Sequence, residues 1–304
     1  MHQAWPKLLV AFALCGATAA TPEQARNIPS GHSISWTAEE AAERTSRYKA
    51  GPFELAMSAR PDPVNADFIT PVLKVVIDGA APVEVEGELG APSYGQQIGL
   101  GRFDRDREYI FFQSYSGGAH CCTSVKIVLP EAGRLQVIDL GAWDGGVVEA
   151  VPSDVDGDGK VDFVFADNRF LYAFASYADS FAPPQILNIE AGEVLDVSNR
   201  PGFRTLFEAF HRDARRVCLD PGEGAANGAC AGYVAAAARL GMFDRAWSEM
   251  LQAHDQRSDW GLEGRCLVAA RDGICPSGQT ARFSSFPEAL REFMIDTGYL
   301  ARLP

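Results

Sequence analysis

The chain has 304 residues, of which 47% are hydrophobic and 22% are charged. This apolar content excludes a disordered tail or a collagen-like fibre, because the chain can bury a core. The formal net charge is -13, from 27 Lys+Arg and 40 Asp+Glu. Such a surface repels phosphate, which counts against nucleic acid as a partner. The length fits one large domain or two ordinary ones.

The first twenty residues have the pattern of a secretory signal peptide. A basic start ending at Lys7 precedes an apolar run over 8–16 and small residues over 17–20. The run is too short to span a bilayer, and no later segment is long and apolar enough to do so. We therefore expect residues 1–20 to be removed and the mature protein to be periplasmic or secreted, with no transmembrane segment.

The segment after the leader is predicted to be helical. Thr37 can cap a helix, and Glu40 follows at the spacing of a capping box. The helix is expected to end near Gly51. We therefore assign residues 21–52 to an N-terminal helical segment.

Residues 53–200 are predicted to form a β domain. Short runs rich in β-branched and aromatic residues alternate there with Gly, Pro and Asp. Ser116–Gly118 lies between two such runs and predicts a hairpin turn. The expected strands are Val72–Ile77, Val83–Glu88, Tyr109–Tyr115, Ser124–Leu129, Leu135–Leu140, Val161–Phe165 and Phe170–Phe174.

Residues 201–304 are predicted to form a helical domain. Gly232–Leu240 is alanine-rich, Gly241 interrupts it, and Asp244–His254 follows as a second helix. The stretch 237–247 resembles the turn of a tetratricopeptide hairpin, but a stable array needs about three such repeats. The alternative is an ordinary helix pair packed on the β domain.

The segment 154–162, with the sequence DVDGDGKVD, carries the strongest chemical signal. Its four carboxylates repel one another unless a cation lies among them. Oxygen ligands at alternating positions suit Ca²⁺, and the two glycines permit a tight bend around the ion. Lys160, at the seventh position, can offer only its carbonyl.

This segment is not an EF-hand, because Phe165 stands where an EF-hand has a bidentate acid. It resembles instead the DxDxDGxxD calcium hairpin of FG-GAP (integrin α-chain type) and VCBS repeats. The resemblance implies a calcium loop between strands of a propeller blade. It also implies a set of ligands, which are Asp154, Asp156, Asp158, the Lys160 carbonyl and Asp162. The alternative is an acidic, solvated turn that binds no metal.

A degenerate second copy of the loop precedes the first. Asp104–Glu108 is followed by Tyr109–Phe112 much as the calcium loop is followed by a β-type run. It lacks a glycine and the ninth-position acid, so we predict no ion there, with Arg105 and Arg107 supplying positive charge. A closed propeller needs at least four blades, more than about 150 residues of β sequence hold at this period. The expected fold is therefore α+β, with an antiparallel partial propeller or sandwich followed by a small helical domain.

The segment Gly117–Thr123 contains His120, Cys121 and Cys122 in succession. One hypothesis is a strained vicinal disulfide between the two cysteines, which could be redox-active or rigidifying. A second is a soft-metal site, because His120 and Cys122 share a face of an extended strand. The third is that each cysteine is buried or bridged elsewhere.

The helical region contains four cysteines. Loss of the leader with Cys15 leaves an even number in the mature chain, and an oxidising compartment then favours disulfides. Nearest-neighbour pairing, preferred among three possible connectivities, gives Cys218–Cys230 and Cys266–Cys275.

The sequence lacks the short catalytic and nucleotide-binding motifs of hydrolases, zinc proteases and P-loop or dinucleotide enzymes. We therefore expect an exported, calcium-binding, non-enzymatic binding or envelope-associated protein. Its ligand would be an unidentified protein or a carbohydrate. The alternative is a thiol–disulfide redox protein or enzyme centred on residues 120–122.

Overall fold

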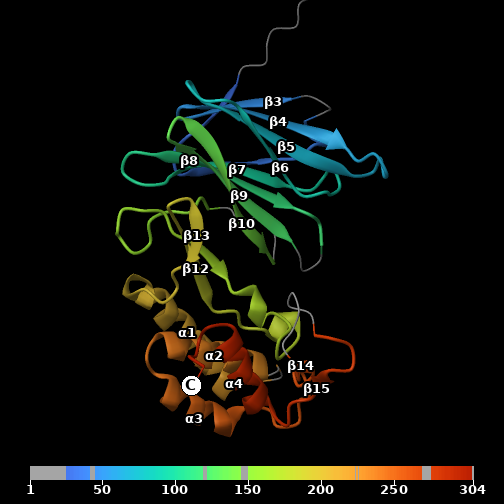
Figure 1. Ribbon diagram of the computed structural model, residues 1–304, viewed down its shortest axis with the longest axis vertical. Coiled ribbons are helices and arrows are strands. Elements are labelled where there is room, and N and C mark those ends of the chain that lie inside the picture. Colours follow the sequence, from blue (N-terminus) through green and yellow to red (C-terminus); the bar gives the residue numbers. More distant parts are fainter. Residues whose placement is uncertain are drawn as a thin grey trace, which may run out of the picture.

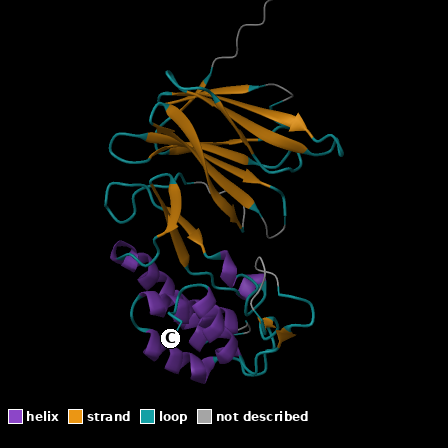
Figure 2. Cartoon of the chain, viewed as in Figure 1, coloured by secondary structure: helices purple, strands orange, loops and turns teal. Residues whose placement is uncertain are grey.

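The computed structural model describes residues 25–41, 45–118, 122–144, 150–222, 224, 226–268 and 275–302. The predicted signal peptide, residues 1–20, lies outside these ranges. The molecule is elongated, with two large sheets at one end, a small sheet in the middle and the helices at the other end (Figure 1, Figure 2). The fold is α+β, with antiparallel sheets and a helical C-terminal region that contains disulfides.

The first large sheet, here called the outer sheet, has the strand order β1-β3-β4-β5-β6. β1 pairs with β3 in parallel, and the other neighbours are antiparallel. The strands are β1 (Arg26–Ile28), β3 (Ser46–Ala50), β4 (Phe53–Pro61), β5 (Ile69–Val76) and β6 (Val83–Glu86).

The second large sheet, here called the central sheet, has the order β10-β9-β8-β7-β2 and is antiparallel throughout. β10 carries an irregularity in its pairing with β9 between Asp139 and Ala142. The strands are β2 (His32–Trp36), β7 (Gln96–Arg102), β8 (Glu108–Tyr115), β9 (Thr123–Glu131) and β10 (Arg134–Trp143).

The central sheet is buried on both faces. On one face Ile110 and Phe112 of β8 pack with the outer sheet in a shared core. On the other face Tyr109 and Phe111 of the same strand pack with Phe163 and its neighbours. This explains the unbroken apolar run in β8, since a strand with one solvent-facing side would alternate apolar and polar residues.

The third sheet is small and antiparallel, with the order β11-β12-β13. It lies between the central sheet and the helices. Leu187 and Ile189 of β12 join the core against the central sheet, whereas Ile186 packs with Phe203 and Phe207 of the helical region. Its strands are β11 (Phe163–Ala166), β12 (Pro184–Glu190) and β13 (Glu193–Asp196).

The helical region surrounds α2, which is buried over most of its length because Ala and Gly allow close helix approach. Disulfides join Cys218 to Cys230 and Cys266 to Cys275, the two nearest-neighbour pairs. No helix in the described ranges has both the length and the apolar character needed to cross a bilayer. The elements are η1 (Asn168–Phe170), η2 (Tyr177–Asp179), η3 (Pro201–Phe203), α1 (Arg204–Leu219), α2 (Ala226–Arg239), α3 (Phe243–Ala253), β14 (Arg265–Cys266), β15 (Thr280–Ala281) and α4 (Phe286–Asp296).

The expected N-terminal helix is wrong. Thr37 Oγ1 does accept the Glu40 backbone N–H at 3.2 Å, as in a helix cap, but only a turn follows over 38–41. Residues 46–50 then form β3, with Tyr48 and Ala50 buried in the sandwich core. Tertiary burial of this alternating pattern overrides the local capping signal.

The strand expected at Phe170–Phe174 is also wrong. Phe170 ends η1, and Phe170 and Phe174 are buried against α4. Ring contacts with Phe293 and Phe286 hold the segment there. Of the two β architectures expected, the described sheets stack as a sandwich with an added third sheet, and none of them closes into a ring.

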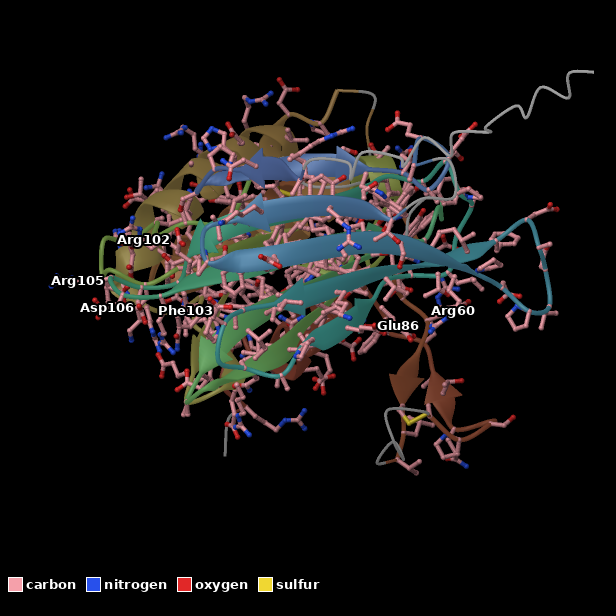
Figure 3. All side chains as sticks on the ribbon, turned by 90° about the horizontal axis from the view of Figure 1, so that it is seen from above. Arg60, Glu86, Arg102, Phe103, Arg105 and Asp106 are labelled. Carbon is pink, nitrogen blue, oxygen red and sulfur yellow. A yellow bond between two sulfur atoms is a disulfide. The ribbon has the colours of Figure 1, made fainter. Side chains whose placement is uncertain are left out.

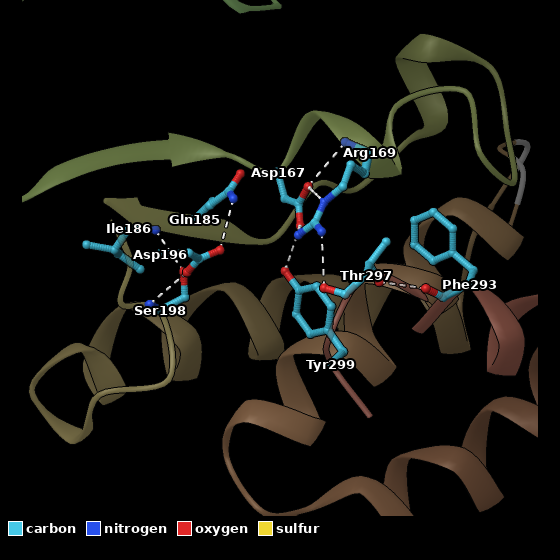
Figure 4. A network of polar contacts seen from close by, with 9 residues as sticks. All are labelled: Asp167, Arg169, Gln185, Ile186, Asp196, Ser198, Phe293, Thr297 and Tyr299. Carbon is cyan, nitrogen blue, oxygen red and sulfur yellow. Dashed lines mark hydrogen bonds and ion pairs between the residues drawn. The ribbon is translucent and has the colours of Figure 1, made fainter. Parts of the chain in front are cut away.

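An ion pair with a buried carboxylate joins the segment after β11 to the residues after α4 (Figure 4). Asp167, which is 0% exposed, accepts hydrogen bonds from Arg169 Nε at 2.7 Å and Nη2 at 2.6 Å. It also accepts the Tyr299 hydroxyl at 3.1 Å, while Arg169 Nη1 donates to the Thr297 carbonyl at 3.1 Å. Residues that are 132 positions apart are thereby held together.

We expect Asp167→Ala to destabilise the protein by roughly 2–4 kcal/mol, because it leaves the Arg169 guanidinium and the Tyr299 hydroxyl without their acceptor. Urea unfolding followed by tryptophan fluorescence measures this. Glu208→Ala is the control, since it removes an exposed pair with Arg204 that is worth little. Equal midpoints for the two variants would contradict the structural role of Asp167.

Candidate functional site: an acidic loop between two sheets

The acidic loop 153–162 lies between β10 and β11. An isolated antiparallel bridge between Ser153 and Asp162 closes it, with the Asp162 N–H donating to the Ser153 carbonyl at 3.1 Å. Gly157 and Gly159 have φ values of +82° and +89°. Side chains with a Cβ rarely adopt this conformation, so the two glycines permit the tight path of the loop.

Backbone N–H groups of the loop orient its carboxylates. Asp154 accepts the N–H of Gly157 at 2.7 Å through Oδ1 and that of Gly159 at 2.9 Å through Oδ2. Asp156 Oδ1 accepts the Asp158 N–H at 3.1 Å. Since each carboxylate oxygen has a second lone pair, these contacts fix the side chains and leave acceptor capacity for an ion.

Three carboxylates converge in the loop. Asp154, Asp156 and Asp162 each place one oxygen within 4.8 Å of the others. Calcium binds oxygens at 2.3–2.6 Å, so two ligands of one ion lie at most about 5 Å apart. Burial, followed by repulsion from Asp162, Asp158 and Asp154, raises the pKa of Asp156. The donor set fits a hard divalent cation.

The two other expected ligands, Asp158 and the Lys160 carbonyl, are not among these three carboxylates. Asp158 lies outside the three converging carboxylates, and its Oδ1 accepts the Lys160 N–H at 2.8 Å. It is close enough to contribute to the raised pKa of Asp156. The roles of Asp158 and of the Lys160 carbonyl as calcium ligands stay predictions.

Asp162 connects the acidic loop to the third sheet. It is 2% exposed, and its Oδ2 accepts the N–H groups of Val155 at 2.8 Å and Asp156 at 3.3 Å. Its Oδ1 accepts Asn188 Nδ2 of β12 at 2.8 Å. Asn188 Oδ1 in turn accepts Arg200 Nη1 at 3.2 Å, which extends the network to the residue before η3.

Gly202 of η3 lies directly against the loop. A Cβ built on this glycine would be 2.4 Å from Asp156 Oδ2 and 2.6 Å from Asp156 Cβ. Any side chain at position 202 would therefore displace the carboxylate. Sequence reasoning missed Asn188, Arg200 and Gly202, because nothing in their local sequence indicates proximity to a loop that precedes them, at 26 residues in the case of the Asp162–Asn188 contact.

The degenerate second loop packs beside the acidic loop. The Val161 N–H donates to the Phe103 carbonyl at 2.9 Å. Arg107 donates to Asp104 Oδ2 through Nε at 2.8 Å and Nη2 at 2.6 Å, so a guanidinium neutralises this carboxylate. Figure 3 shows Arg102 and Arg105 at the same edge of the molecule.

A cleft of about 670 Å³ lies between the two loops. Arg102, Arg105 and Lys160 line it together with Asp154, so positive side chains border the acidic loop. A ligand in this cleft would contact both loops.

The His120-Cys121-Cys122 segment is described only at its end. His120 and Cys121 lie outside the described residues. Cys122 is disulfide-bonded, and its backbone N–H donates to Ser116 Oγ at 2.9 Å. β8 and β9 pair as an antiparallel hairpin across this connection. The vicinal disulfide stays a prediction, whereas a disulfide-bonded Cys122 has no thiolate to offer the soft-metal site of the second hypothesis.

Part of the helical region matches a known family model. Residues 210–298 match the family model described as the sll0997 C-terminal domain. The matched region begins within α1 and ends just after α4. It therefore contains most of the helical domain and both described disulfides.

Two relatives extend the similarity beyond that region. A probable thylakoid lumen protein, sll0997, of Synechocystis is 38% identical over 205 residues, or 65% of this chain and 58% of that protein. An uncharacterized protein, y4bJ, of Sinorhizobium fredii is 36% identical over 193 residues, or 63% of this chain and 30% of that protein. The chain thus spans less than two thirds of the length of these relatives. No solved structure matches it.

We expect Asp162→Ala to destabilise the protein by roughly 3 kcal/mol even without calcium. The substitution leaves the Val155 and Asp156 N–H groups without their side-chain acceptor, and it removes the Asp162 carboxylate from the acceptors of the Asn188 amide. Chemical unfolding in the presence of a chelator measures the loss. Asp106→Ala, at an exposed position of the neighbouring loop, is the control and should unfold like the wild type. An unaltered midpoint for Asp162→Ala would contradict its role as the anchor of the loop.

Proposed function

We propose that this chain is an exported protein that binds one calcium ion in the acidic loop and acts as a non-enzymatic binding or envelope-associated module. The observation that carries the proposal is the convergence of the Asp154, Asp156 and Asp162 oxygens within 4.8 Å. The resemblance of the loop to FG-GAP and VCBS calcium hairpins supports the same ion.

Export is supported by two independent features. The first is the leader-like sequence over residues 1–20. The second is the relative whose printed name places it in the thylakoid lumen, a compartment separated from the cytoplasm by a membrane. The disulfides of the helical region agree with an oxidising compartment.

The proposed role of the ion is structural. It would neutralise repulsion among carboxylates that contact two other parts of the fold. Asp156 lies against Gly202 of η3, and Asp162 reaches Asn188 of β12. A bound ion would therefore stabilise the junction of the third sheet with the helical region, and it would shape the adjoining cleft for a protein or carbohydrate ligand.

Calcium is expected to raise the melting temperature of the folded protein by several degrees, because an ion that binds only the native state stabilises it by mass action. Differential scanning calorimetry with calcium and with EGTA measures the shift. Asp154→Asn and Asp156→Asn should abolish most of the calcium-dependent part. Asp106→Asn, which removes an equal charge from the neighbouring loop, should retain it.

The calcium concentration in these scans must extend to about 10 mM, because extracellular calcium modules often have dissociation constants of only 10⁻⁴–10⁻³ M. Identical melting curves with calcium and with EGTA over this range would overturn the proposal. An equal shift in Asp154→Asn, Asp156→Asn and wild type would show that calcium acts elsewhere on the protein, and would also overturn it.

A further inference from the structure

A second cavity lies in the helical region, away from the acidic loop. It has a volume of about 270 Å³ and opens between α1, α2 and α3. Its lining residues come from these helices and from the residue before α3, and all belong to the region that matches the family model. They are His211, Arg212, Arg215, Tyr233, Met242, Arg245 and Ala246.

The cavity is cationic, although the chain as a whole carries a formal charge of -13. Three arginines line it, and no acidic residue does. Arg215 lies four positions after His211 and three after Arg212, so it neighbours both of them on the surface of α1. Such a concentration of guanidinium groups attracts an anion, and guanidinium geometry matches carboxylate and phosphate oxygens.

Glu249 of α3, which does not itself line the cavity, binds two of the arginines that do. Arg215 and Arg245 contact its carboxylate through Nε, at 2.7 and 3.0 Å, so the Nη ends of these side chains take no part in those two bonds. The Tyr233 hydroxyl donates to the same carboxylate at 2.8 Å. The Arg215 hydrogen bond is the largest effect that lowers the pKa of Glu249, to about 2. Glu249 thus pairs with two of the three arginines that line the cavity, which leaves positive charge in excess.

One wall of the cavity is apolar. Met242 and Ala246 form part of it, and the Tyr233 ring lies 4.9 Å from the His211 ring. Burial, followed by repulsion from Arg215, lowers the pKa of His211, which favours the uncharged ring. The imidazole and phenol rings, together with this apolar wall, favour contact with a small apolar group of a ligand.

We propose that this cavity binds a small organic oxyanion, a phosphate monoester or a carboxylate. Its oxyanion would lie on Arg212, Arg215 and Arg245, and its apolar part against Met242 and Ala246. The volume accommodates a single ring or a short chain. The site is formed by the helical region alone, so it does not depend on the calcium loop or on the function proposed for it.

Isothermal titration of the full-length mature protein with phenyl phosphate, benzoate and inorganic phosphate tests this inference. We expect saturable binding of at least one organic anion that weakens as salt increases. That anion should bind more tightly than inorganic phosphate, because only it can use the apolar wall. Tighter binding of phenyl phosphate would show that the cavity prefers a phosphate monoester, and tighter binding of benzoate that it prefers a carboxylate.

Arg212→Gln and Arg216→Gln form a matched pair for the same titration. Both remove one exposed arginine from α1, but only position 212 lines the cavity. Arg212→Gln should weaken binding about tenfold, as expected for loss of one charge-assisted hydrogen bond, while Arg216→Gln should not. Failure of both organic anions to bind, or equal weakening by the two substitutions, would overturn the inference. Since both positions are exposed, unchanged melting temperatures should show that the variants fold.

Discussion

The architecture depends on burial of the central sheet from both sides. Strand β8 presents Ile110 and Phe112 to one apolar core and Tyr109 and Phe111 to another. Neither set can be exposed without a large loss of hydrophobic stabilisation, so the sheet requires a covering layer on each face. The outer sheet supplies one layer and the third sheet the other. The third sheet thereby becomes the platform on which the helices pack, through Ile186 on its opposite face.

Directional hydrogen bonds position the third sheet relative to its neighbours, which non-directional apolar packing does less specifically. Asp162 and Asn188 join the acidic loop to β12, and Asp167 with Tyr299 joins the end of β11 to the residues after α4. Each of these acids is buried and hydrogen-bonded, so loss of a partner leaves an unsatisfied group. The candidate calcium site lies in the first of these junctions. Under the proposed function, an ion bound there would stabilise this junction as well as the loop itself.

The two candidate sites have opposite charge and different construction. The acidic loop collects its carboxylates from nearby positions in one short segment, and backbone N–H groups orient them. The cationic cavity collects side chains from three helices, and one carboxylate, Glu249, positions two of its arginines. The two candidate sites thus lie in different parts of the chain, one in the loop before β11 and the other among α1, α2 and α3.

The sequence by itself determined the features that depend on neighbouring residues. The strands β8, β9 and β10, the alanine-rich α2, the acidic loop and the two nearest-neighbour cysteine pairs could all be predicted, because each signal lies within a short window. Tertiary structure decided what depends on distant partners. It turned residues 46–50 into β3 against a local capping signal, and it bent Phe170 and Phe174 into the helical core instead of a strand. It also brought Asn188, Arg200 and Gly202 to the acidic loop, and Tyr233 and Glu249 to the arginines of α1 and α3. The physical reason is that burial and side-chain pairing across layers exceed local propensity, and they act between residues whose separation along the chain carries no signal.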